Sequence, residues 1–238
     1  GLIKSGNVAN LPFKLHDFGA RGVSSSESAQ IGGAAHLVNF KGSDTWEAIE
    51  FINEYYMEDM AGYSIPASEH STITAWGKDR ELEAYANMLE MFPDKMFACV
   101  SDSYNIVNAV ENLWGEKLKE KIKERTIPMV TRPDSGDPTD SPIDVIQRYA
   151  KKLGYSNNEK HFMIVNGMLV IQGDGNNEVV IPKTISKLLG LNYSLDNLSF
   201  GMGGELLQSF GRDDMQFAQK ACAVKKHNSG WEGISKNP

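Results

Sequence analysis

Side chains that could do chemistry gather in five short clusters, each beside an apolar run. The clusters are residues 15–22 (LHDFGARG), 69–71 (EHS), 132–136 (RPDSG), 172–175 (QGDG) and 200–204 (FGMGG), and Arg212 and Asp213 follow the last one. Arginine side chains and glycine-rich turns bind phosphate oxygens, whereas carboxylates bind ribose hydroxyls or magnesium-bound water. The order and spacing of the clusters therefore predict an enzyme that handles a phosphorylated substrate.

Each cluster has a simpler interpretation when it is taken alone. Arg132 and Asp134 could close a turn as an ion pair instead of binding phosphate and ribose, and the glycines of 201–204 could form an ordinary turn. His70 stands beside a carboxylate and hydroxyls, which favours a reactive imidazole over a structural one only in that context. Asp102, Asp134, Asp137 and Asp174 are hard oxygen ligands suited to magnesium, whereas no spacing is typical of zinc.

Three familiar catalytic signatures are missing from the sequence. The glycine spacing at 201–204 is not that of a dinucleotide-binding Rossmann turn, and there is no P-loop. There is also no Gly-x-Ser-x-Gly elbow, which argues against an α/β-hydrolase.

Short apolar runs alternate with longer segments of helical period, which predicts βα units and a parallel sheet. The expected strands are 37–40, 63–65, 96–100, 127–131, 168–171 and 197–200, and the expected helices are 45–56, 80–92, 106–124, 143–153 and 183–189. Ser43 and Ser141 are expected at helix starts, and 155–160 is expected to be a surface loop. The predicted fold class is α/β, an irregular TIM-like (β/α) barrel that forms one domain over residues 1–238.

Most of the clusters follow directly on an expected strand. Asp102 follows 96–100, Arg132 and Asp134 follow 127–131, Gly173 and Asp174 follow 168–171, and Gly203 and Gly204 follow 197–200. In α/β barrels the active site lies at the carboxyl ends of the strands, where the βα loops converge. We therefore expect these residues to meet at one face of the barrel.

Composition limits the classes of partner. The 238 residues are 41% hydrophobic and 23% charged, as in an ordinary globular protein. A formal net charge of -7 argues against a nucleic-acid partner, and no apolar stretch is long enough to predict a membrane span. Cys99 and Cys222 both lie in apolar settings, which predicts two core thiols in a reducing, cytoplasmic location.

With these motifs in view, the sequence resembles the nicotinamide phosphoribosyltransferases, a family of type II phosphoribosyltransferases. The resemblance runs through residues 15–25 (LHDFGxRGVSS), 39–44 (NFKGxD), 69–78 (EHSTITAWGK), 132–136, 172–175 and 200–204, and ends with Arg212 and Asp213. The family joins nicotinamide to 5-phosphoribosyl pyrophosphate and releases pyrophosphate. That chemistry needs a stabilised sugar cation and leaving group and no general base.

The resemblance implies roles for the residues that match these motifs. Phe18 would stack on the pyridine ring, with His16 in the same motif, Arg21 would hold the amide oxygen, and Asp44 would accept from the amide nitrogen. Nicotinate would instead place a carboxylate against Asp44, so this contact would select nicotinamide.

The remaining motifs would bind the phosphorylated sugar. The resemblance assigns phosphate and ribose to Arg132 and Asp134, the pyrophosphate–magnesium region to Asp102, and the ribose phosphate to Gly173, Asp174, Gly203 and Gly204, with Arg212 and Lys220 as further phosphate ligands. His70 matches the histidine that ATP phosphorylates in the family. We therefore take His70, Asp102 and Asp134 as the catalytic residues, and Mg²⁺ and ATP as the implied cofactors.

Two departures from the family pattern bear on function. Ala98 stands where the family has a serine, which would alter the lining of the pocket. The family also has a large region ahead of the Phe18 motif and residues after Pro238, and its homodimer supplies a partner's tyrosine to the ring stack. The resemblance thus implies a central domain of such an enzyme. The alternatives are a nicotinate phosphoribosyltransferase and a ligand-binding fragment that is catalytically incomplete.

Overall fold

The structure is a computed structural model, and it describes residues 1–207, 220–227 and 230–234. Its centre is a six-stranded sheet in which every pair of neighbouring strands is parallel. In spatial order the strands are β2 (Gly42–Ser43), β1 (Leu15–Asp17), β8 (Leu198–Met202), β7 (Met168–Gln172), β4 (Met129–Arg132) and β3 (Ala98–Val100). Two antiparallel pairs, β5 (Tyr155–Asn157) with β6 (Met163–Val165) and β9 (Ala223–Lys225) with β10 (Trp231–Gly233), lie outside this sheet.

Residues 63–68 join the two edge strands and close the sheet into a ring. Ser43 N donates to Tyr63 O at 3.0 Å on the β2 side, and Ala98 N donates to Pro66 O at 2.9 Å on the β3 side. Pro66 has no N–H to give to a ladder, so this segment makes single bridges instead of a regular strand. The predicted irregular (β/α) barrel is thereby confirmed, although the expected strand at 63–65 makes a single bridge, at Tyr63, and a second bridge follows at Ala67.

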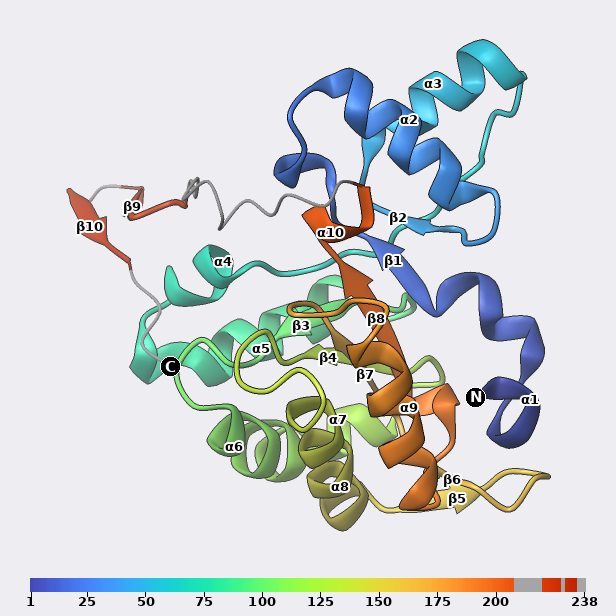
Figure 1. Cartoon of the computed structure of the whole chain (residues 1–238). Helices are drawn as coiled ribbons and strands as arrows, with labels where there is room; N and C mark the ends of the chain where they lie inside the picture. Colours follow the sequence, from blue (N-terminus) through green and yellow to red (C-terminus); the bar gives the residue numbers. More distant parts are fainter. Residues whose placement is uncertain (208–219, 228–229, 235–238) are drawn as a thin grey trace.

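Helices surround the barrel, as Figure 1 shows. They are α1 (Leu2–Ser5), α2 (Ser26–Leu37), α3 (Trp46–Tyr56), α4 (His70–Thr74), α5 (Glu81–Met91), α6 (Ile106–Asn108), α7 (Lys119–Lys123), α8 (Ser141–Leu153), α9 (Val180–Gly190) and α10 (Gly204–Leu207). The expected helix at 106–124 contains a π-helical middle at Ala109–Lys117. Within the described ranges, no helix has both the length and the apolar character needed to cross a membrane.

The main core lies between the sheet and helices α5 and α8 together with the π-helical stretch. Tyr85 of α5 stacks on Trp114 with ring centroids 4.5 Å apart, and Tyr149 of α8 reaches Thr131 of β4 through a 2.7 Å hydrogen bond between hydroxyls. All three aromatic side chains are fully buried. Helix α8 begins with Ser141 and Pro142 as expected and ends at Gly154, whose φ of +80° suits glycine.

Several local predictions were wrong, and two of the errors concern α2 and β1, which the sequence did not indicate. Residues 37–40 are the end of α2 and the turn after it, whereas the strand that starts the barrel is β1, inside the LHDFG motif. Helix α2 lacks an apolar stripe and contains Gly32 and Gly33. A Cβ at Gly33 would lie 2.6 Å from Ala48 Cβ of α3, so the glycine serves close helix packing that no periodicity reveals.

Three further corrections concern single residues and a loop. Ser43 lies in β2 instead of starting a helix, although its hydroxyl accepts from Thr45 N at 3.1 Å just before α3. Residues 155–157 form β5, an exposed strand, because β6 offers it a partner across a short turn. Cys99 is buried as expected, but Cys222 is exposed.

Lys14 carries a buried charge at the opposite end of β1 from the site described below. Its Nζ donates to the carbonyl oxygens of Leu195, Asp196 and Leu198 at 2.9–3.0 Å. Burial lowers the pKa of Lys14 to about 8, and the charge of Asp196 opposes this shift only in part. The ammonium group thus ties β1 to the start of β8 at a cost in desolvation.

We expect Lys14→Met to lower the free energy of unfolding by about 2 kcal/mol, because it removes the donor from three carbonyls and leaves buried polar groups less well satisfied. Urea denaturation measures this change. Lys4→Met, at an exposed lysine of α1, is the control and should have little effect. Equal stability of the Lys14→Met variant and the unsubstituted protein would contradict the role of Lys14.

Candidate active site

The carboxyl ends of the sheet strands carry most of the residues that the sequence singled out. Asp17 ends β1, Asp44 follows β2 and Asp102 follows β3. Arg132 ends β4, Asp134 lies two residues later, Gly173 and Asp174 follow β7, and Gly203 and Gly204 follow β8. Because the strands are parallel, these residues lie at one edge of the barrel, as expected.

His70 is held between two of these carboxylates. Its Nε2 lies 2.8 Å from Asp102 Oδ1, and its Nδ1 lies 3.8 Å from Asp134 Oδ2. His70 is the first residue of α4, and a capping box between Glu69 and Thr72 stabilises the start of this helix. The sequence clusters at 69–71, 102 and 132–136 therefore form one site.

Asp102 is the buried member of this group, with a side chain that is 2% exposed. Its second oxygen, Oδ2, accepts from the Ser135 hydroxyl and from Asp134 N, the latter at 3.2 Å. Both oxygens thus contact donors within the protein, as a buried carboxylate requires. This geometry orients His70 and the turn after β4.

Arg132 and Asp134 lie against the turn that follows β7. Arg132 Nε is 4.0 Å from Asp134 Oδ1, and no described residue accepts a hydrogen bond from this buried Nε–H group. A Cβ at Gly173 would lie 2.6 Å from Asp134 Oδ1 and 3.2 Å from Arg132 Cδ. Gly173 is therefore required for the close approach of these two strand ends.

Phe18 forms a second part of the site, at the end of β1. Its ring packs on Gly201 of β8 so closely that a Cβ at Gly201 would lie 2.0 Å from Phe18 Cε2. The His16 ring lies 4.8 Å from the Phe18 ring, centroid to centroid, at a 42° tilt. The absence of a side chain at Gly201 thus sets the position of Phe18.

Asp44 is joined to this aromatic pair through His16. Asp44 Oδ1 lies 3.0 Å from His16 Nε2 and accepts from the Ser64 hydroxyl at 2.5 Å. The Asp44 side chain is 45% exposed, and its partial burial raises its pKa. The hydrogen bonds from His16 and Ser64 and the positive charges of His16 and Arg132 outweigh this effect and bring the pKa below 3.8. Asp44 is therefore an anion at neutral pH.

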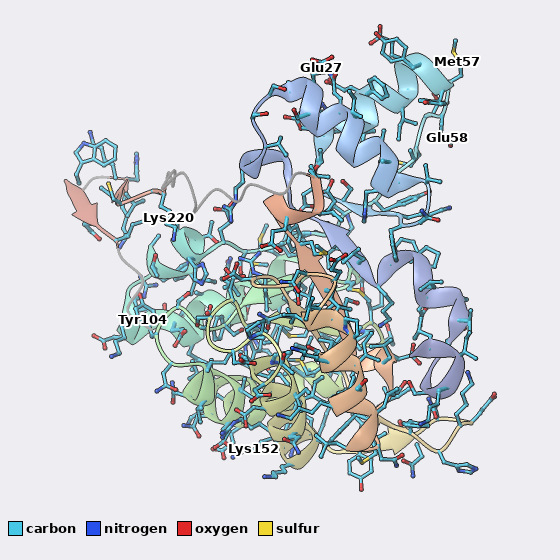
Figure 2. The ribbon with its side chains drawn as sticks, in the orientation of Figure 1. Glu27, Met57, Glu58, Tyr104, Lys152 and Lys220 are labelled. Atoms are coloured by element: carbon cyan, nitrogen blue, oxygen red, sulfur yellow. The ribbon has the colours of Figure 1, made fainter. Side chains whose placement is uncertain are left out.

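The other predicted residues differ in how they are placed. Arg21 lies in the short turn Ala20–Gly22 and is exposed, and so is Asp174. No atom of the described residues lies within 4 Å of where a Cβ of Gly203 would be, whereas Gly204 starts α10 and packs on Gly22. Lys220 is exposed (Figure 2), and no hydrogen bond or ion pair joins it to the site among the described residues. Arg212 lies outside the described residues.

Sequence reasoning missed two polar residues that support the site, Ser64 and Asn176, and gave no role to Gln172, which opens the 172–175 cluster. Ser64 stands inside an apolar run and carried no signal of its own. Gln172 and Asn176, which flank the Gly173–Asp174 turn, are buried and bond to backbone carbonyls. Only their position in or beside a cluster could have drawn attention to them.

Comparison with known proteins matches this arrangement to one family. Residues 13–238 match the nicotinate phosphoribosyltransferase (NAPRTase) family. The chain belongs to the nicotinate phosphoribosyltransferase family. Relatives named nicotinamide phosphoribosyltransferase come from Xanthomonas campestris (47% identical over 230 residues), Mycoplasma pneumoniae (32% over 240) and Acinetobacter baylyi (29% over 262).

These alignments cover most of this chain but only part of each relative. They span 96%, 95% and 99% of this chain and 49%, 51% and 51% of the respective relatives. This member of the nicotinate phosphoribosyltransferase family thus spans about half the length of the curated relatives it matches. The matched half contains the barrel ends just described.

We expect His16→Ala to raise the pKa of Asp44, because it removes a hydrogen bond and a positive charge while the partial burial of Asp44 still raises the pKa. A ¹³C NMR titration of the Asp44 carboxyl group measures this shift. Because the folded pKa lies below the ordinary value of 3.8, Asp44 contributes stability above that pH and loses it as the pH falls through the folded pKa. His16→Ala should reduce that contribution.

The exposed His227 provides the control variant, His227→Ala, which should leave the Asp44 titration unchanged. An Asp44 pKa that stays the same in His16→Ala would show that His16 does not hold the carboxylate.

Proposed function

We propose that this chain carries the catalytic barrel of a nicotinamide phosphoribosyltransferase, which joins nicotinamide to 5-phosphoribosyl pyrophosphate in NAD salvage. The observation that carries the proposal is Asp44, an anion joined through His16 to Phe18 and near enough to Arg132 to be influenced by its charge. A ring-binding group and a phosphate-binding group thus share one barrel edge. The names of the relatives support the same reading.

In the proposed reaction, the pyridine nitrogen attacks C1 of the ribose and the bond from C1 to the pyrophosphate oxygen breaks. The electron pair leaves with pyrophosphate, and no proton is transferred at the nitrogen. Phe18 would stack on the ring, with Arg21 at the amide oxygen and Asp44 at the amide nitrogen. Arg132, Asp134 and the glycine turns would hold the phosphorylated sugar and stabilise charge on the leaving group.

Magnesium fits this site as an ion that arrives on the substrate. Among the described residues, no group of three or more His, Cys, Asp or Glu side chains is placed to hold a metal ion. Mg²⁺ commonly keeps several waters and binds one or two carboxylates together with substrate phosphates, a role that Asp134 and Asp174 suit. When bound, the ion would neutralise charge on the departing pyrophosphate.

His70 is proposed as the residue that ATP phosphorylates. An ionised carboxylate only accepts hydrogen bonds, so the contact with Asp102 places the proton on His70 Nε2 and leaves the lone pair on Nδ1. Attack of Nδ1 on the γ-phosphorus of ATP would form the N–P bond and release ADP. Asp102 would stabilise the positive charge on the ring. We also propose a homodimer and a cytoplasmic location for the enzyme.

The proposal predicts a substrate preference that depends on Asp44. The protein should form mononucleotide from nicotinamide, Mg²⁺ and 5-phosphoribosyl pyrophosphate, and much less from nicotinate. Asp44→Asn should lower the nicotinamide-to-nicotinate ratio of kcat/KM at least about tenfold, because it removes the repulsion between two carboxylates. Asp59→Asn, on an exposed loop after α3, should leave the ratio unchanged.

Two results would overturn parts of this proposal. A preference for nicotinate in the unsubstituted protein would make it a nicotinate phosphoribosyltransferase. Binding of both mononucleotides without turnover would identify a ligand-binding module. In that case calorimetric Kd values for the two mononucleotides replace kcat/KM in the Asp44→Asn comparison.

The phosphohistidine is tested separately by labelling with γ-³²P-ATP. We expect acid-labile, alkali-stable label in the unsubstituted protein and loss of the label to background in His70→Asn. His161→Asn is a matched control, because His161 is exposed and asparagine tolerates its φ of +63°. Label that persists in His70→Asn would place the modification elsewhere.

A further inference from the structure

Two glycine-bearing turns lie side by side at the carboxyl ends of β7 and β8. The register of these strands pairs Gln172 with Phe200, and there the pairing ends. Beyond it β7 enters the Gly173–Asp174 turn, whereas β8 continues to Met202 before the Gly203–Gly204 turn. No strand pairing therefore sets the distance between the two turns.

The side chain of Asn176 connects them at this point. Its Nδ2 donates to Gln172 O at 2.7 Å and to Gly201 O at 2.9 Å, so it bridges β7 and β8 one residue past the last strand pair. Both acceptors are carbonyl oxygens, so the amide nitrogen must face them. Asn176 is 5% exposed, which removes water as a competing partner for these bonds.

A second buried amide holds the turn from inside. Gln172 is 1% exposed, and its Nε2 donates to Asp174 O at 2.9 Å. The turn is thus fixed internally by Gln172 and attached to its neighbour by Asn176. Without the Asn176 amide, Gln172 would still hold the shape of the Gly173–Asp174 turn. The bridge that fixes the distance between this turn and β8 would be lost.

That separation matters on both sides of the site. On one side, Gly173 lies against Asp134 so tightly that a Cβ would come within 2.6 Å of its carboxylate. On the other side, Gly201 supports the Phe18 ring and also supplies a carbonyl oxygen to Asn176. Asn176 therefore joins the backbone of the phosphate-binding turn to the backbone beneath the aromatic ring.

We propose that Asn176 is a positioning residue that holds the Gly173–Asp174 and Gly203–Gly204 turns at the separation needed to bind one phosphate group of the phosphoribosyl substrate. This inference rests on the proposed function and extends it to a residue outside the substrate contacts. Asn176 acts through the two turns, so it controls affinity for the phosphorylated sugar. Gly201 is also held by its pairing with His16 of β1, so loss of the Asn176 bridge should move the β7 turn and leave the Phe18 ring in place. We therefore expect little effect on nicotinamide binding or on His70.

The test compares Asn176→Leu, which keeps the shape but removes both donated bonds, with the unsubstituted protein. We expect KM and the calorimetric Kd for 5-phosphoribosyl pyrophosphate to rise about tenfold, because small displacements of a positioned group are costly. The KM for nicotinamide, kcat and ATP labelling of His70 should change little. Asn176→Asp, with at most one donor in a side chain of the same size, should weaken binding in the same way and covers the case in which Asn176→Leu does not fold.

The matched control is Asn177→Ala in the same turn. Asn177 Oδ1 accepts from Val179 N and Val180 N at the start of α9. Among the described residues its side chain makes no hydrogen bond to β8, so its loss should lower stability without releasing the two turns. Thermal melting confirms that each variant is folded. If Asn177→Ala weakens substrate binding as much as Asn176→Leu, or if both Asn176 variants bind normally, the inference fails. If the unsubstituted protein binds no 5-phosphoribosyl pyrophosphate, the proposed function itself fails.

Discussion

The arrangement of the site depends on one buried carboxylate, that of Asp102. A charge removed from water must be satisfied by hydrogen bonds, and Asp102 obtains them from His70 and from the Ser135 hydroxyl and Asp134 N in the turn after β4. These partners come from two separate parts of the chain, the start of α4 and the turn after β4. One desolvated group therefore sets where α4 begins and where the turn after β4 lies relative to β3.

Close backbone approaches complete what Asp102 begins. Gly173 lets the β7 turn lie against Asp134, and Gly201 lets the Phe18 ring lie on β8. At both positions a methyl group would overlap a neighbouring side chain, so the glycines act as contact surfaces more than as flexible points. Phe18 after β1 and the Arg132–Asp134 turn after β4 are consequently separated by two strands, β8 and β7.

Charged side chains at both ends of β1 are held by specific partners. Asp44 stays ionised because the effects of His16, Ser64 and Arg132 on its pKa together outweigh that of its partial burial. An anion held in this way can accept from an amide and disfavours a second carboxylate. Lys14, at the other end of β1, carries a positive charge, and its burial lowers its pKa. Its hydrogen bonds to three carbonyl oxygens serve the fold.

The sequence by itself determined the α/β class, most of the helices and the position of the candidate site residues after the strands. It could do so because apolar periodicity and turn residues are local signals. It also indicated His70, Asp102 and Asp134 as separate clusters. It missed α2, whose glycines serve packing against α3, and β1, which is short and lies inside a functional motif. Tertiary structure alone decided the closure of the ring through residues 63–68 and the contacts of Ser64, Gln172 and Asn176. These depend on which strands become neighbours, and residue types along the chain carry no information about a hydrogen bond between segments that meet only in the fold.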